Sequence, residues 1–241
     1  IENWAGGTDF EGSTSEFNDT GGRFGGAWEF GTTNTLSNSQ VNVIRSVDTV
    51  TMMAWVKRAG NSSNSGVIIQ EGDSAASIGL YTDCTTNDNI TFGYDASGNY
   101  VVSTDNRVFN DGRWHHLAGV YDGDLNMNYI YVDGVLMNNA SATGDITDHS
   151  PTDGVQIGKS SALPAPSGGL CGVGGFNGTF DEVGIWNRSM TATEIADIYR
   201  LKTDKYFWKV NVSDATNFNN ESESREFVVK ETQMKIRGGV N

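Results

Sequence analysis

The sequence has few of the residues on which metal, redox and nucleic-acid chemistry depend. It holds only 2 cysteines, 3 histidines and 3 prolines, and its 16 Lys and Arg residues are outnumbered by 30 Asp and Glu residues. Two cysteines cannot by themselves make a four-ligand zinc site. No basic cluster is present and the formal net charge is −14, so phosphate backbones and anionic lipid surfaces would repel the chain. We therefore expect no nucleic-acid partner.

Long apolar runs are also missing. None approaches the ~20 residues that a membrane-spanning helix needs, so we expect no direct membrane insertion. No signal peptide is visible at Ile1, and we expect the chain to be a mature fragment. The acidic composition fits a protein that is soluble outside cells, and it leaves carboxylates available for divalent cations.

Glycine is abundant, with 30 of 241 residues, and short β-branched and aromatic runs alternate with clusters of Gly, Asn, Asp and Ser. This pattern is typical of an all-β protein with many turns. The clearest stretch, 110–136, predicts strands over 114–121, 128–132 and 135–136. Asp133-Gly134 lies between two of them and predicts a type I′ hairpin, since both central residues of that turn need positive φ. This meander carries no catalytic motif, and we interpret it as scaffold.

Further strands are predicted over 27–30, 40–44, 49–57, 67–70, 78–81, 89–94, 100–103, 155–158 and 180–187, whereas residues 1–25 lack periodicity and are predicted to be loops. One helix is predicted over 190–201. Thr191 is its N-cap, Glu194 closes a capping box, and Met190 can pack onto Ile195 as a hydrophobic staple.

Asp181 is the acidic residue that the strand pattern singles out. Alternation over 180–187 places Asp181 on one face with Val183 and Ile185, and Glu182 with Gly184 on the other. An unpartnered carboxylate on an apolar face costs too much free energy. We therefore expect Asp181 to meet a cation, an arginine or backbone N–H groups.

Several segments, in order, resemble the laminin-G-like jelly roll of the concanavalin A-like lectin/glucanase superfamily. They are GGAWEF (25–30), TMMAWVK (51–57), GRWHHLAGVYDG (112–123), IYVDGVL (130–136) and FNGTFDEVGIWNRSMTATEIADIY (176–199). The resemblance covers about residues 5–201. It implies an all-β sandwich of two antiparallel sheets, with the short helix near 191–201 and a C-terminal hairpin. The chain starts at or after the loop that follows the family's first strand, so we expect that strand to be missing.

The resemblance also implies a function and a site. Many members are carbohydrate-binding or adhesive modules, and members often bind structural calcium near the start of the strand that carries Asp181. Hard oxygen ligands suit this acidic chain, and the expected calcium partners of Asp181 are Asp19, Asn18 and the carbonyl of Gly26. Exposed aromatic rings over a concave sheet would stack on sugars, for which the candidates are Tyr81, Tyr94, Tyr100, Tyr129 and Tyr131.

The C-terminal segment differs from the rest. Residues 206–213 and 224–230 predict a hairpin that resembles the last strands of an immunoglobulin-like module from a prokaryotic surface protein. We divide the chain into a jelly roll, 1–203, and an Ig-like hairpin, 204–241. An isolated hairpin is marginal in water, so its expected partner is an upstream segment of the same polyprotein or a neighbouring Ig-like module. The alternative is a hairpin that extends a jelly-roll edge.

Cys84 and Cys171 lie in polar, Gly-rich loops and are expected to form a disulfide, which would stabilise the fold by roughly 4–5 kcal/mol in the chain-entropy model. Two separate thiols are the alternative. Asn-x-Ser/Thr sequons favour a secreted, glycosylated surface protein. They begin at Asn18, Asn61, Asn89, Asn139, Asn177, Asn187, Asn211 and Asn220.

Catalysis has weak support in the sequence. A retaining glycosidase needs two carboxylates on one face about 5–5.5 Å apart, and Asp181 and Glu182 are adjacent on a strand, so they point to opposite faces. His115 and His116 cannot ligate one ion from the same face, and no nucleophile elbow accompanies His149. The sequence therefore favours a non-catalytic extracellular module for glycans or surface proteins. The alternatives are a structural spacer or assembly subunit that pairs by edge strands and, more remotely, a glycoside hydrolase.

Overall fold

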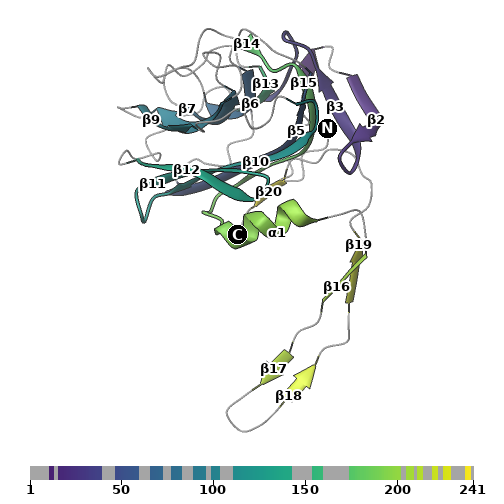
Figure 1. The fold of residues 1–241 in the computed structure, drawn as a ribbon, viewed down its shortest axis with the longest axis vertical. Helices are drawn as coiled ribbons and strands as arrows, with labels where there is room; N and C mark the ends of the chain where they lie inside the picture. Colours follow the sequence, from purple (N-terminus) through teal and green to yellow (C-terminus); the bar gives the residue numbers. More distant parts are fainter. Residues whose placement is uncertain are drawn as a thin grey trace.

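Two β-sheets packed face to face form the body of the protein in the computed structural model (Figure 1). The structure describes residues 11–13, 16–39, 47–59, 66–72, 77–82, 89–95, 99–103, 111–142, 154–159, 174–201, 205–208, 211–213, 219–221, 225–228 and 237–239. Pairing within each sheet is antiparallel apart from two short strands, so the predicted all-β jelly-roll sandwich is confirmed.

The first sheet has the strand order β1-β4-β13-β6-β7-β8-β9, with β14 pairing parallel to β6. Its strands are β1 (Glu11–Ser13), β4 (Thr35–Asn38), β6 (Gly66–Gly72), β7 (Ser77–Thr82), β8 (Ile90–Asp95), β9 (Asn99–Ser103), β13 (Val155–Gly158) and β14 (Gly174–Gly175).

The second sheet has the order β12-β11-β10-β5-β15-β3-β2, with β20 pairing parallel to β15. Its strands are β2 (Glu16–Gly22), β3 (Gly25–Phe30), β5 (Thr49–Arg58), β10 (Trp114–Asp122), β11 (Met127–Val132), β12 (Val135–Ser141), β15 (Gly178–Trp186) and β20 (Arg237–Gly239).

The expected meander forms three adjacent strands at one side of the second sheet. Strands β10, β11 and β12 follow one another, and β10 pairs with β5 along its whole length. Asp133 and Gly134 both have positive φ, 51° and 76°, as the predicted type I′ turn requires. Both faces of β5 are buried, which explains why its sequence is apolar at nearly every position.

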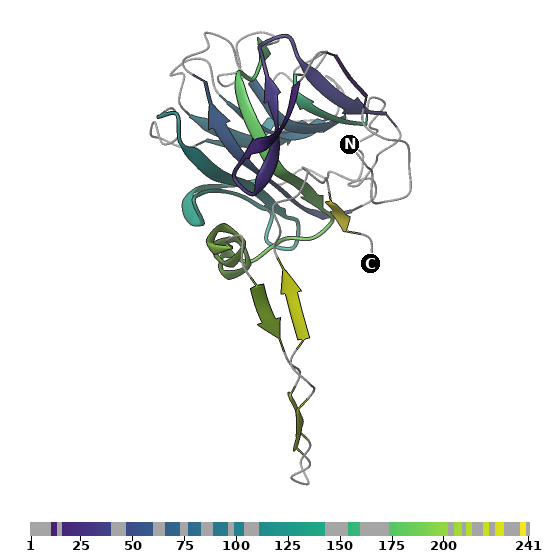
Figure 2. The same cartoon turned by 90° about the vertical axis from the view of Figure 1, so that its right-hand side faces the viewer.

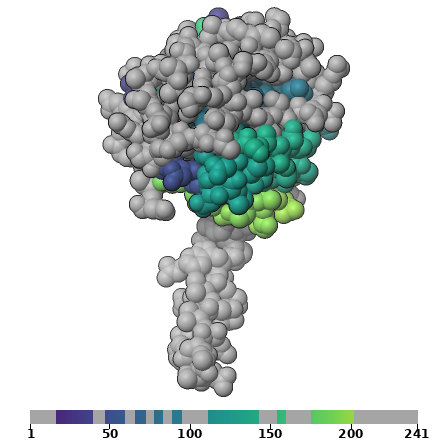
Figure 3. All heavy atoms as spheres, turned by 90° about the vertical axis from the view of Figure 1, so that its left-hand side faces the viewer, coloured from purple at the N-terminus to yellow at the C-terminus, as the bar shows by residue number. Residues whose placement is uncertain are grey.

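The hydrophobic core fills the space between the sheets. Met52, Ala54 and Val56 face it from β5, and Phe92 and Phe180 meet them from the two sheets. All five side chains are fully buried. The outward-facing residues of β5 are also buried, because helix α1 (Ala192–Arg200) covers that side of the second sheet with a smaller cluster centred on Ile195. Figure 3 shows α1 (green) beside the meander (teal).

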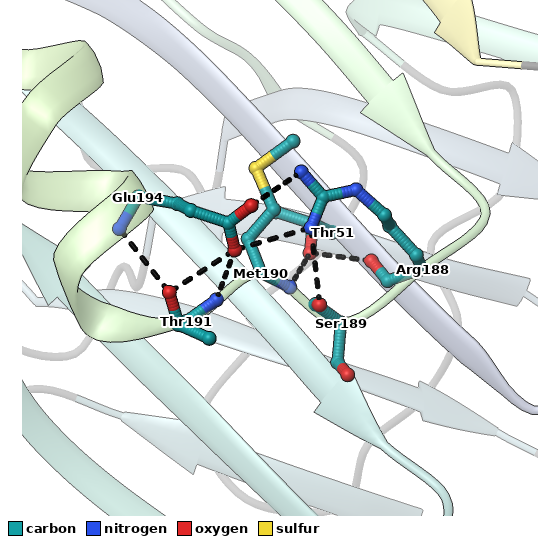
Figure 4. Close-up of polar contacts among 6 residues, drawn as sticks. All are labelled: Thr51, Arg188, Ser189, Met190, Thr191 and Glu194. Carbon is teal, nitrogen blue, oxygen red and sulfur yellow. Dashed lines mark hydrogen bonds and ion pairs between the residues drawn. The ribbon is translucent and has the colours of Figure 1, made fainter. Parts of the chain in front are cut away.

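The helix begins as the sequence predicts and is tied to β5. Thr191 and Glu194 form the capping box, and Arg188 makes a two-pronged ion pair with Glu194 (Figure 4). These contacts lower the pKa of Glu194 to about 2, the hydrogen bond from Arg188 being the main cause. The Thr51 hydroxyl donates to the Arg188 carbonyl at 2.8 Å and accepts from Met190 N at 3.0 Å. The start of the helix is therefore fixed over the sheet.

The sequence analysis expected residues 1–25 to be loops, but parts of this segment form strands. Residues 11–13 form β1, and residues 16–22 form β2, which pairs with β3 through a hairpin at Gly22 and Gly25. The prediction failed here because an edge strand with a register shift needs no apolar alternation, since its backbone hydrogen bonds to β3 decide its conformation. The strand expected over 40–44 falls outside the described residues.

The C-terminal segment forms a long hairpin that points away from the body (Figure 2). Strand β16 (Lys205–Trp208) pairs with β19 (Arg225–Val228), and β17 (Asn211–Ser213) pairs with β18 (Asn219–Glu221). The chain then returns to the second sheet, where β20 lies along β15. The Ig-like assignment of this hairpin and the domain boundary at 203/204 stay predictions.

Candidate ligand-binding site

A hollow of about 530 Å³ opens on the outer side of the second sheet, beside the end of α1. It is lined by Arg23, Trp55, Trp114, Tyr199 and Arg200. These residues come from the β2–β3 turn, β5, the start of β10 and the last turn of the helix. Volumes of this size are typical of small-molecule sites. The hollow therefore brings together three aromatic and two cationic side chains from four separate parts of the fold.

The aromatic side chains form a stepped surface. The ring of Trp55 stacks on Tyr199, with centroids 5.6 Å apart and planes at 23°, and Phe24 meets Trp55 edge-on at 5.9 Å. Trp55 is only 3% exposed, so it acts as the floor. Trp114 and Tyr199 are half-buried and are the rings that a ligand can reach.

Tyr199 is held in place from both sides of the helix end. The turn at Gly134 packs against Ala196 and Tyr199, where an added Cβ would lie 3.1 Å from both residues. Gly134 thus serves the hairpin through its positive φ and the helix through its small size. The meander, interpreted as scaffold from sequence, positions one wall of the hollow.

Arg23 covers the floor of the hollow. Its guanidinium carbon lies 4.8 Å from the ring centre of Trp55 and 4.9 Å from that of Phe24, within the range of cation–π attraction. On the opposite side, Arg200 makes an ion pair of 3.1 Å with Asp197, one turn earlier in α1. Both partners of that pair are about two-thirds exposed, at 68% and 67%.

Asp181 lies buried beneath the β2–β3 turn. Its Oδ2 accepts a hydrogen bond from Phe24 N at 2.8 Å, and its Oδ1 accepts one from Glu182 N at 2.8 Å. Burial raises the pKa of Asp181, and these backbone hydrogen bonds together with the charge of Arg23 oppose the increase. The expected partner is therefore found among the backbone N–H groups.

The predicted face of Asp181 is wrong. Asp181 pairs with Trp55 and Gly184 pairs with Met53, so a β-bulge adds one residue to β15 and Glu182 takes φ 48°. The bulge places Asp181 on the side of Trp55, whereas Val183 and Ile185 belong to the core between the sheets. A strict alternation of side chains could not reveal this, because a bulge shifts the period by one residue.

The surroundings of Asp181 offer oxygen atoms to a cation. A methyl group at Gly22 would lie 2.6 Å from the carbonyl oxygen of Gly26, and 2.8 Å from both Asp181 Oδ2 and the carbonyl oxygen of Gly25. Three oxygens therefore lie close to Gly22 and to one another. Within the described residues, no cluster of three or more His, Cys, Asp or Glu side chains could hold a metal.

The other expected calcium partners lie differently. Asn18 uses its side-chain amide to donate to Glu29 Oε1 at 2.9 Å, and its side-chain oxygen accepts from Thr20 N at 3.1 Å. Asp19 is exposed. Of the predicted calcium shell, the structure therefore brings the Gly26 carbonyl to Asp181, while the side chain of Asn18 is occupied elsewhere.

Two neighbouring histidines have opposite environments. His115 lies between two carboxylates, 2.8 Å from Asp133 Oδ2 and 3.0 Å from Asp111 Oδ1. Carboxylates only accept hydrogen bonds, so both contacts are satisfied when both ring nitrogens carry protons. The hydrogen bond to Asp133 is the main cause that raises the pKa of His115, with Asp111 adding to it and burial opposing.

His116 is 2% exposed and packs behind the hollow, with its ring centre 5.4 Å from Trp55 and 6.4 Å from Tyr199. Its Nδ1 is buried and has no hydrogen-bond partner within the part of the chain that the structure describes. Burial lowers the pKa of His116 to about 4. His116 is therefore a neutral packing residue.

The tyrosines expected to bind sugar are mostly packing residues. Tyr81, Tyr94 and Tyr131 are 1–5% exposed, which leaves no ring face on which a sugar could stack, so they do not belong to the site. Tyr129 is half-buried against the cluster under α1, and the side chain of Tyr100 lies outside the described residues. The prediction failed because alternation cannot tell a covered face from an open one.

Sequence reasoning missed the residues that line the hollow. The sequence analysis placed Trp55 in a predicted strand, Trp114 in the scaffold meander and Tyr199 in the predicted helix. One signal was available: Trp55 and Trp114 pair across β5 and β10 to within two residues, on a face that also receives the helix. Neither arginine carries a local motif, so only the tertiary structure brings them to the aromatics.

The remaining predicted residues are modification sites. Cys84, Cys171 and Asn61 lie outside the described residues, as do the side chains of Asn211 and Asn220, so their roles stay predictions. Asn139 is exposed on β12, whereas Asn177 donates its amide to the Ala59 carbonyl at 3.0 Å. Asn89 and Asn187 are half-buried. Asn139 is thus an accessible sequon.

No helix among the described residues is long and apolar enough to cross a membrane. No curated protein matches the chain with significant sequence similarity. Solved structures do share its fold. Domain 4 of AbnA, an extracellular GH43 arabinanase from Geobacillus stearothermophilus solved in complex with arabinotriose, matches with a TM-score of 0.59 and 20% identity over 79% of this chain and 83% of that chain.

A second similar structure is the CBM40 of the IT-sialidase from Ruminococcus gnavus, bound to α2,3 sialyllactose. It matches with a TM-score of 0.56 and 12% identity over 72% of this chain and 96% of that one. The family model that matches residues 30–196 is described as concanavalin A-like lectin/glucanases superfamily. The match covers more than half of the sequence, and the two-sheet sandwich agrees with it. The chain therefore belongs to the concanavalin A-like lectin/glucanases superfamily.

Proposed function

We propose that this protein is a non-catalytic carbohydrate-binding or adhesion module of a larger extracellular protein, and that the hollow at Trp55, Trp114 and Tyr199 holds the sugar. The observation that carries this proposal is the aromatic surface itself. It combines a stacked, buried floor with two half-buried rings at its edge. Aromatic rings with polar groups beside them suit ligands that present both apolar faces and hydroxyl groups.

The comparisons support the same class of ligand. The similar domain of the arabinanase is in complex with arabinotriose, and the similar CBM40 is bound to sialyllactose. Both likenesses lie well below the identity at which residues could be transferred. The choice of this hollow as the sugar site therefore rests on its own geometry.

The absence of catalysis is also a proposal, and it is supported by the carboxylates of β15. Glycosidase chemistry needs a pair of carboxyl groups that face each other across a bound sugar. Asp181 is fully buried with both oxygens hydrogen-bonded to backbone N–H groups, and the bulge turns its neighbour Glu182 away from strand geometry. Asp181 is therefore unsuited to act as nucleophile or acid on a sugar.

The test is a glycan array that includes arabinotriose and sialyllactose, followed by calorimetric titration of the best ligand. Replacing Trp114 with alanine removes an accessible ring and is expected to weaken binding about tenfold, because stacking and the lost apolar contact together amount to about 1.4 kcal/mol. Phe17→Ala is the matched control, since Phe17 is an exposed aromatic residue (37%) on β2 that does not line the hollow.

Equal losses in both variants would place the site elsewhere. An array without hits would overturn the proposal and favour the second candidate, a spacer that assembles through edge strands. That alternative has its own observation, because Val135 and Leu136 are 62% and 43% exposed on the edge strand β12. Sedimentation of the protein at increasing concentration would then show self-association.

We also propose that the module binds calcium at Asp181, with the carbonyl oxygens of Gly25 and Gly26. These oxygens all lie close to Gly22, and Ca²⁺ prefers carboxylate and carbonyl ligands. A carboxylate has about four acceptor positions, of which backbone N–H groups of Arg23, Phe24 and Glu182 use three. Bound calcium would neutralise a buried charge and link the β2–β3 turn to β15.

Calcium at 100 times its dissociation constant is expected to stabilise the fold by about 2.7 kcal/mol, which raises the melting temperature by roughly 5–10 °C over a chelated sample. Asp181→Asn and Gly22→Ala should both abolish the shift, the latter because its methyl group would come within 2.6–2.8 Å of the three oxygens and force them apart. Asp124→Asn, an exposed carboxylate in the β10–β11 turn, should keep it. A melting temperature that is the same with calcium and with chelator would contradict the proposed calcium site.

A further inference from the structure

The hollow has a charge opposite to that of the protein as a whole. The chain carries a formal net charge of −14, yet among the described residues the charged ones that line the hollow are Arg23 and Arg200, and none of these is acidic. Fields inside a partly enclosed, apolar surface are less screened than fields at the open surface. The sugar site is therefore a local positive region on an acidic molecule.

Arg23 is available to a ligand. Its guanidinium lies over the Trp55 and Phe24 rings, and within the residues that the structure describes it makes no ion pair with a carboxylate. Asp181, on which the charge of Arg23 acts, is fully buried and accepts hydrogen bonds from the backbone N–H groups of Arg23, Phe24 and Glu182. Stacking on two rings leaves the edge of the guanidinium, with its N–H donors, unused.

Arg200 has a partner that a ligand can replace. Its ion pair with Asp197 joins two side chains on the same exposed helix face, about two-thirds accessible each. Exposed pairs of this kind contribute little to stability because water and salt screen them. A carboxylate or sulfate group that enters the hollow can therefore compete for the Arg200 guanidinium.

We infer that this hollow selects sugars that carry an anionic group, with Trp114 and Tyr199 against the ring and the guanidinium groups of Arg23 and Arg200 on a carboxylate or sulfate. The inference rests on the proposed function, because it names the ligand class of the same site. Arginine suits this task since its planar donors match the geometry of a carboxylate and form charge-assisted hydrogen bonds.

The experiment compares matched probes by calorimetric titration of the full chain. Trigalacturonate is the carboxylated probe, α-1,4-galactotriose is its neutral counterpart, and a 6-O-sulfated galactotriose separates sulfate from carboxylate recognition. We expect at least one anionic probe to bind about tenfold or more tightly than the neutral probe, since one charge-assisted hydrogen bond accounts for such a factor. Raising the salt concentration from 0.1 M to 1 M should reduce that preference several-fold.

The variants Arg23→Gln and Arg200→Gln should each remove most of the preference, measured as the ratio of the affinities for the anionic and the neutral probe in the same variant. Arg200 is exposed, so its variant tests the inference even where Arg23→Gln impairs folding. Lys159→Gln is the control, because it removes one positive charge just after β13 of the other sheet, at a residue that does not line the hollow. Equal loss in this control would reduce the effect to net charge and overturn the inference.

The remaining outcomes separate the inference from the proposed function. Tight binding of neutral sugars with no anionic preference would overturn the inference and leave a carbohydrate-binding module. Failure of every probe and of the glycan array would overturn both. An anionic preference that survives in both arginine variants would place the anion site away from this hollow.

Discussion

Replacing Gly119 with alanine is expected to lower the free energy of unfolding by about 3 kcal/mol. Gly119 lies in the middle of β10, between Met52 of β5 and Ile130 of β11, with its bare face toward the opposite sheet. A methyl group at this position would overlap the ring of Phe92, which is fully buried in the core. Strand β10 cannot move away from Phe92, because it is hydrogen-bonded to β5 on one side and to β11 on the other.

The expected loss of stability in Gly119→Ala is opposite in sign to the usual effect of replacing glycine with alanine. At a compatible position, glycine to alanine stabilises a protein by about 0.4–1 kcal/mol through the unfolded chain. Denaturant unfolding of Gly119→Ala, Phe92→Leu and the double variant would measure the coupling. The smaller leucine should recover 1 kcal/mol or more of the loss caused by the methyl group. Strict additivity of the two changes would contradict the close contact between the sheets.

Acidification is expected to destabilise the protein through His116 by about 3 kcal/mol. The pKa of this buried ring is about 4, against 6.5 in the unfolded chain, and each unit of difference corresponds to 1.36 kcal/mol. The folded state therefore binds fewer protons than the unfolded state between these values. The stabilising contribution of His116 is complete above pH 6.5 and is lost progressively as the pH falls to 4.

His115 acts in the opposite direction and in a different pH range. Its folded pKa is raised by Asp133 and Asp111, so the stability that it contributes is complete below pH 6.5 and is lost as the pH rises through the folded value. With these two neighbouring histidines, stability should be highest close to pH 6.5. Asp111, whose own pKa is lowered by its hydrogen bonds to Arg113 and His115, remains charged throughout this range.

Two variants separate the histidines in unfolding experiments at several pH values. His116→Phe keeps a ring against Trp55 and Tyr199 and removes a buried nitrogen that has no partner among the described residues. The variant should therefore be as stable as the original protein or more stable at pH 7.5. It should also lose much less folding stability when the pH falls from 6.5 to 4. His115→Gln should instead reduce the loss of folding stability as the pH rises above 6.5. An NMR titration that places the pKa of His116 near 6.5 would contradict the prediction.

The sequence by itself determined the local structure. The Asp133-Gly134 turn and the Thr191–Glu194 capping box depend on contacts within a few residues, and both occur as predicted. The two-sheet architecture was also predictable, because short apolar runs between turn residues leave few other ways to bury a core. The order of the family segments then identified the superfamily, which the match over residues 30–196 confirms.

Only the tertiary structure decided where the proposed ligand site lies and which way Asp181 faces. The bulge at Glu182 depends on how β15 pairs with β5, and a one-residue shift reverses every assignment to a face. Tyr81, Tyr94 and Tyr131 are buried rather than open to a sugar, which periodicity does not record. The hollow joins Arg23, Trp55 and Tyr199 from distant parts of the chain, and no short-range interaction in the sequence holds them together. Short-range rules fix turns and caps, whereas a site made by the packing of a helix, a hairpin and a sheet exists only once all three have assembled.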